Sequence, residues 1–77
     1  MINMPMINMQ KTGANIKMLM KLNNIKVIQI QDILGFNTPQ AIYKWLRGET
    51  MPTIDNMVIL ATLLNTTIDN IIITEMI

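Results

Sequence analysis

The segment IQIQDILGFNTPQAIYKWLRGETMP, residues 28–52, carries the strongest structural signal in this sequence. Its first part has apolar residues at helical intervals, namely Ile30, Ile33 and Leu34. The pattern stops at Gly35, and glycine commonly ends a helix because it adopts a left-handed backbone without strain. The segment therefore predicts a short helix from about Val27 to Leu34.

A second helix is predicted from about Pro39 to Arg47. Thr38 is a typical capping residue, and a proline is tolerated in the first helical turn. Gly48 ends the pattern. The inner, apolar side of this helix consists of Ala41, Ile42, Trp45 and Leu46. Its outer, polar side consists of Gln40, Tyr43, Lys44 and Arg47. The helix is thus amphipathic, and we expect Trp45 in the core rather than exposed for base stacking.

Two short helices joined by a tight glycine-containing turn form a helix-turn-helix, whose second helix usually lies in the DNA major groove. The polar side of the second helix fits this role. Glutamine can bond adenine in two places, lysine can donate to guanine, and tyrosine and arginine can reach phosphate. Asn37 and Thr38, at the helix entrance, can bond a phosphate oxygen. An ordinary solvated helix face would carry similar residues, so the polar composition alone is not decisive.

The composition restricts the class of protein. The chain has 77 residues, no cysteine and no histidine, and about half of its residues are apolar. This length fits one domain held together by core packing alone. A nucleophile–base pair would have no His, Cys or Ser to draw on, and the few acids are scattered along the chain. We therefore expect no enzyme, no cofactor and no metal site.

No segment looks suited to a membrane or to export. The longest apolar run, Met57 to Ala61, is far shorter than the roughly twenty residues that span a bilayer. The N-terminal residues MINMPMINMQK lack the features of a signal peptide. A cytoplasmic protein is expected.

The charges are unevenly distributed along the chain. Residues 1–47 contain all six Lys and Arg and one acid, whereas residues 48–77 contain four acids and no base. A basic half beside an acidic half suits a molecule that turns one face toward a polyanion. With eleven charges, coincidence would give the same picture.

The rest of the chain predicts an all-α bundle. Residues 1–10 show no helical pattern and are expected to form a flexible or extended arm, with an edge strand or a dimer-swapping segment as the alternative. The domain proper would occupy residues 11–77. Three more helices are predicted: from about Gly13 to Asn23 after Thr12, to about Leu64 after Thr53, and from Ile68 to about Ile73 after Thr67. Ile54, Val58, Ala61 and either Leu63 or Leu64 would face inward.

The ordered pieces resemble the lambda-repressor-like, XRE-type helix-turn-helix family, whose members are five-helix domains of bacterial and phage transcription regulators. The resemblance covers about residues 13–73. It rests on five pieces in order: Gly13–Ile16, Ile30–Gly35, Ile42–Gly48, Pro52 and Leu64–Ile71. It implies a phosphate contact at Lys26, because the N-terminus of the following helix commonly faces the DNA backbone in this family.

Three departures from the family pattern stand out. Gln31 replaces a small alanine and must tilt outward or find a partner. The turn before Ile42 is one residue longer, which shifts the base-contacting positions by up to one residue and adds Ala41 to the candidates. Met20 and Leu46 replace an arginine–glutamate pair, and an apolar pair can do so at no net cost.

These observations predict a sequence-specific regulator of transcription, most simply a repressor, that binds double-stranded DNA with helix 39–47. The alternative is a protein-interaction module, such as an antitoxin-like adaptor, built on the same bundle. Useful specificity normally needs a two-fold dimer. The C-terminal apolar residues outnumber the places in one small core, so the expected dimer interface is Ile72, Ile73, Met76 and Ile77.

Overall fold

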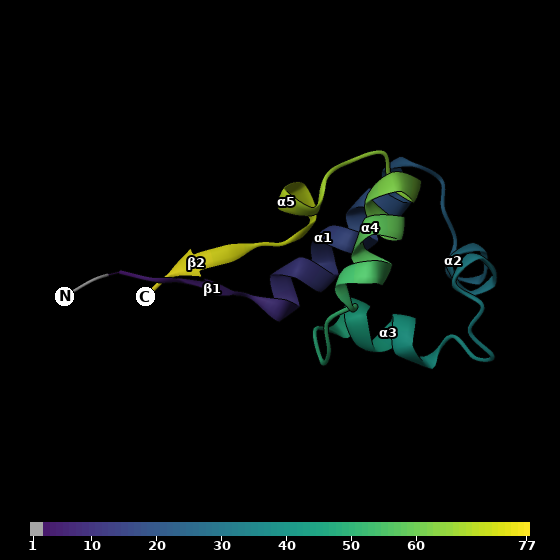
Figure 1. The fold of residues 1–77 in the computed structure, drawn as a ribbon, viewed down its shortest axis with the longest axis horizontal. Helices are drawn as coiled ribbons and strands as arrows, with labels where there is room; N and C mark the ends of the chain where they lie inside the picture. Colours follow the sequence, from purple (N-terminus) through teal and green to yellow (C-terminus); the bar gives the residue numbers. More distant parts are fainter. Residues whose placement is uncertain (1–2) are drawn as a thin grey trace.

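The computed structural model describes residues 3–77, which form five helices and a two-stranded antiparallel sheet (Figure 1). The helices are α1 (Met9–Leu22), α2 (Val27–Leu34), α3 (Gln40–Arg47), α4 (Ile54–Leu63) and α5 (Ile68–Ile71), and the strands are β1 (Pro5–Ile7) and β2 (Thr74–Met76). The strands lie together at one end of the molecule and α2 lies at the other. The predicted five helices are therefore present, but the description all-α is only approximate.

Helix α1 begins earlier than the sequence suggested. Asn8 caps it, and the Asn8 side chain accepts a hydrogen bond from the backbone N–H of Lys11 at 2.9 Å. The expected cap, Thr12, is instead fully buried inside the helix, where its hydroxyl accepts a hydrogen bond from the N–H of Ile73 at 2.9 Å. The predicted start at Gly13 was wrong because two capping residues lie one turn apart and Asn8 does the capping.

The other helix boundaries follow the sequence signals closely. Gly35 and Gly48 both adopt the left-handed conformation after α2 and α3. Thr53 and Thr67 cap α4 and α5 through their side chains, as predicted. Two boundaries differ. Pro39 rather than Thr38 occupies the cap position of α3, without a side-chain bond, and α5 ends at Ile71 instead of continuing to Ile73.

The sheet joins the two ends of the described chain. Pro5 pairs with Met76, and Ile7 pairs with Thr74. Of the expected arm, residues 5–7 are thus an extended strand, and residues 9 and 10 belong to α1.

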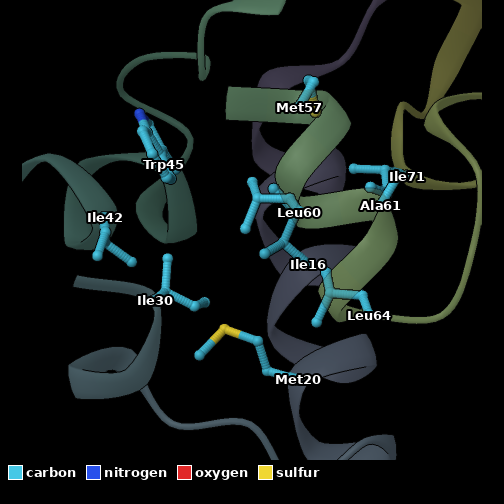
Figure 2. Close-up of a cluster of buried hydrophobic side chains, with 10 residues drawn as sticks. All are labelled: Ile16, Met20, Ile30, Ile42, Trp45, Met57, Leu60, Ala61, Leu64 and Ile71. Atoms are coloured by element: carbon cyan, nitrogen blue, oxygen red, sulfur yellow. The ribbon is translucent and has the colours of Figure 1, made fainter. Parts of the chain in front are cut away.

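The core lies between the helices and is almost entirely aliphatic. Its buried members are Ile16, Met20, Ile30, Ile42, Trp45, Met57, Leu60, Ala61, Leu64 and Ile71 (Figure 2). The predicted inward placement of Trp45 is confirmed, and its ring meets the edge of Phe36 with centroids 5.9 Å apart. Gln31 finds a partner, since its amide donates to the carbonyl of Phe36 at 3.3 Å.

Two predicted core positions on α4 are wrong. Ile54 and Val58 are 68% and 52% exposed, because α4 turns Met57 and Leu60 inward instead. Ile33 is also exposed.

Candidate nucleic-acid interface

The outer side of α3 presents the predicted polar residues together. Gln40, Tyr43, Lys44 and Arg47 line one shallow pocket of about 300 Å³. All four side chains are exposed. The arrangement offers an amide, a phenol and two cations on a single helical face, which are groups able to contact bases and phosphates.

The inner side of α3 holds this face in a fixed orientation. Ile42 is fully buried and Trp45 nearly so. Helix α1 packs closely behind them, and a Cβ atom built on Gly13 would lie 2.3 Å from the carbonyl oxygen of Trp45. Glycine is therefore required at this crossing. Replacing a buried large aromatic residue by alanine typically costs about 3–5 kcal/mol, so Trp45 anchors the helix strongly.

A larger pocket of about 580 Å³ lies beside the first and shares Tyr43 and Arg47 with it. Its apolar floor comes from residues such as Met20, Ile25 and Leu46. Its cations come from three different places in the chain: Lys17 and Lys21 on α1, Lys26 before α2, and Arg47 on α3. With Lys44, these residues form what we call the basic face: Lys17, Lys21, Lys26, Lys44 and Arg47.

Lys17 and Lys21 belong to a part of the basic face that the sequence leaves open. Their spacing puts them on the solvent side of α1, where such lysines could either attract phosphates beside the groove or only solubilise the helix. They are exposed, but the packing of α1 against α3 brings them to the same pocket as Arg47. Their spacing of four residues places Lys17 and Lys21 on one side of α1. That this side lies beside α3 depends on how the two helices pack, which the spacing does not show.

Arg47 is paired with an acid that the sequence reasoning also overlooked. Its guanidinium forms an ion pair and a hydrogen bond with the carboxylate of Glu49, just past the end of α3. This hydrogen bond raises the pKa of Arg47 and lowers the pKa of Glu49. Both side chains are about half exposed, so solvent screens the pair. A DNA phosphate would have to compete with Glu49 for Arg47.

The remaining predicted contact residues are dispersed. Asn37 and Thr38 are exposed in the turn between α2 and α3, whereas Ala41 is half-buried and packs against the core. Lys26 is exposed just before α2, with its backbone N–H bonded to the side chain of Gln29 at 2.7 Å.

The four residues predicted for a dimer interface differ in exposure. Ile72 packs against the core, and Ile73 is half-buried between α5 and β2. Met76 and Ile77 are 63% and 65% exposed in and after β2. Because α5 ends at Ile71, Ile72 and Ile73 lie outside the helix that was predicted to reach Ile73.

No helix among residues 3–77 is long and apolar enough to cross a membrane. Across the same residues, no three acidic, histidine or cysteine side chains come close enough together to hold a metal ion.

The chain matches the model of a known protein family. A family model described as helix-turn-helix matches residues 16–71, well over half of the chain. That range runs from α1 to α5 and includes all five residues of the basic face. No curated protein and no solved structure matches the chain significantly.

Proposed function

Because this chain belongs to the XRE-type, lambda-repressor-like helix-turn-helix family of DNA-binding domains, we propose that it is a sequence-specific regulator of transcription that inserts α3 into the DNA major groove. The observation that carries this proposal is the amphipathic character of α3. Its inner side is buried in the core through Ile42 and Trp45. Its outer side bears only polar or amphipathic residues, and lysines from α1 and from the start of α2 lie beside it.

The residues of this surface would have two roles. Gln40 would read base edges, because glutamine can make a paired contact with adenine. Lys44 and Arg47 would contact guanine or phosphate. The rest of the candidate contact surface lies at the entrance and along the side of α3 and consists of Asn37, Thr38, Ala41 and Tyr43. Lys17, Lys21 and Lys26 would bind the phosphates that flank the groove. Such contacts position the protein without selecting a sequence.

A single copy of α3 spans few base pairs. We therefore infer a homodimer that binds a two-fold symmetric operator, in which case the separation of the two half-sites reflects the protein's own symmetry. Repression is the simplest regulatory outcome, because occupying an operator can block transcription without further contacts. The cytoplasm would be its place of action.

Mobility shift of a random duplex pool, followed by selection of bound sequences, tests the proposal. Lys44→Ala and Arg47→Ala should each weaken binding and reduce the slope of log affinity against log salt by about 0.9 for each bound domain. Lys11→Ala is the matched control, since Lys11 lines neither pocket. Unchanged affinity in both α3 variants, with unchanged melting, would remove α3 from the interface.

A protein-interaction module, such as an antitoxin-like adaptor, is the second candidate. Exposed Ile54 and Val58 lie one turn apart on α4 and favour it, because an apolar stripe suits a protein partner. Failure to bind any duplex in the selection, together with saturable binding to a protein partner that Val58→Asp abolishes, would support this candidate instead.

A further inference from the structure

The two strands and their flanking residues, 3–8 and 73–77, form a ribbon that extends away from the helices (Figure 1). We call it the terminal ribbon. It lies along the longest dimension of the molecule, 45 Å against 22 and 20 Å in the other directions. Every residue of both strands is exposed. A two-stranded sheet without further support is only marginally stable in water.

The terminal ribbon is also unusually apolar for an exposed element. Five of its large apolar side chains are at least 48% exposed: Met4, Met6, Ile7, Met76 and Ile77. Glu75 is its only charged residue, and the amide of Asn8 donates to the Glu75 carboxylate at 3.2 Å. Exposed edge strands are normally protected by being short, by charges or proline, or by covering elements. This ribbon lacks the charges, which points to a surface that is covered in use.

The hydrogen-bond pattern shows which backbone groups point outward. Met4 and Ile77 exchange two backbone hydrogen bonds, of 3.3 and 3.1 Å, and the N–H of Asn8 donates to the carbonyl of Ile73 at 2.8 Å. In an antiparallel pair, residues whose backbone groups bond to the partner strand alternate with residues whose N–H and C=O groups face away from it. With the observed register, Thr74 and Met76 of β2 therefore direct their N–H and C=O groups outward.

The two edges of the ribbon are not equivalent. On β1, one of the two outward positions is Pro5, which has no N–H to donate. Proline on an edge strand blocks the addition of another strand. On β2, both outward positions keep their N–H groups. The outer edge of β2 is thus the open edge of the ribbon.

We propose that two copies of this chain pair through the outer edge of β2, antiparallel and about a two-fold axis, to form a four-stranded sheet in the order β1–β2–β2–β1. An antiparallel edge is self-complementary, so a second copy offers matching donors and acceptors without any additional partner. Four strands also exceed the number at which a sheet becomes stable on its own. The inference deepens the homodimer of the proposed function by assigning its interface.

The decisive variant is Met76→Pro, with Ile7→Pro as the matched control. Each removes one outward N–H and leaves the hydrogen bonds inside the ribbon in place, but only Met76 lies on the open edge. Analytical ultracentrifugation without DNA should give a dimer for the wild type and for Ile7→Pro. Met76→Pro should raise the dimer dissociation constant about tenfold or more, because each dimer loses two backbone hydrogen bonds.

Amide hydrogen exchange on the wild type gives a second measurement that does not depend on any variant. The N–H groups of Thr74 and Met76 should gain protection as protein concentration rises, whereas that of Ile7 should exchange rapidly throughout. A wild type that stays monomeric at millimolar concentration, or equal effects of the two proline variants, would overturn the proposal. Lys44→Ala should still dimerise, so failure of DNA binding and failure of this interface are distinguishable.

Discussion

At the level of single residues, Glu49 competes with DNA for Arg47 of the basic face. Glu49 neutralises Arg47 in the free protein, and the lowered pKa of Glu49 fixes the pH range in which it does so. A carboxyl whose pKa is lowered in the folded state keeps its interaction above the ordinary glutamate pKa and loses it only as the pH falls through the lowered value. At neutral pH the pair is therefore complete, and DNA must displace Glu49 to reach Arg47.

We predict that Glu49→Gln strengthens binding to any duplex, cognate or not. The substitution removes a negative charge beside the phosphates and frees Arg47 from a competing carboxylate, so affinity should rise by a similar factor for both kinds of duplex. Fluorescence anisotropy over a salt series measures the affinity for each duplex. Asp69→Asn, on α5, is the control, because Asp69 lines neither pocket. Weaker binding by Glu49→Gln would mean that Glu49 positions Arg47 rather than competing for it.

At the scale of elements, capping and turn residues made the fold predictable, whereas the orientation of one helix was not. Val27–Leu34 was predicted with its observed bounds, because Gly35 marks its end unambiguously. Helix α4 is apolar on most sides, so the stripe of Ile54 and Val58 looked as suitable for the core as that of Met57 and Leu60. Only packing against the other helices decides between such stripes.

The terminal strands were hard to predict for a related reason. Each has three residues, too few for an alternating pattern to stand out, and they pair with residues at the opposite end of the chain. The same limit applies to the basic face. Lys44 and Arg47 could be predicted from the period of α3, but the place of Lys17 beside them depends on how α1 crosses α3.

That crossing gives a prediction at the scale of elements. Gly13→Ala should destabilise the domain although alanine is the better helix former, because the new Cβ would lie 2.3 Å from the carbonyl oxygen of Trp45 and 2.7 Å from that of Leu46. Backbone atoms cannot move aside as a flexible side chain can, so we expect a loss of about 1–3 kcal/mol in the free energy of unfolding. Urea denaturation measures it. An increase in stability would show that the two helices separate at little cost.

The control for this variant lies next to it in α1. Ala14 is exposed, so Ala14→Gly should cost only the difference in helix propensity, about 1 kcal/mol. If steric contact with α3 is the cause, Gly13→Ala should also disturb α3 and lower DNA affinity, whereas Ala14→Gly should leave the affinity of the folded protein unchanged.

At the scale of the whole molecule, a net charge of +1 conceals a polarised surface. Five of the six bases belong to the basic face. Of the acids, only Glu49 pairs with it among the described residues, and the other four line neither pocket: Asp32, Asp55, Asp69 and Glu75. Such polarity favours binding to a polyanion more than the net charge suggests, because the interaction depends on the charges at the contact.

The number of residues in the basic face sets an upper limit on the salt dependence of DNA binding. If all five residues of the basic face contact phosphate, the slope of log affinity against log salt should reach about −4.5 for one domain and about −9 for a dimer with both domains bound. Titrations of the wild type and of Met76→Pro should therefore differ about twofold in slope, provided that the variant binds as a monomer. A dimer slope of about −3.6 would mean that Lys17, Lys21 and Lys26 do not reach the DNA and that contact is confined to Lys44 and Arg47 of α3. Lys17→Ala then decides the matter, since it should lower the slope if α1 flanks the groove and leave it unchanged if α1 does not.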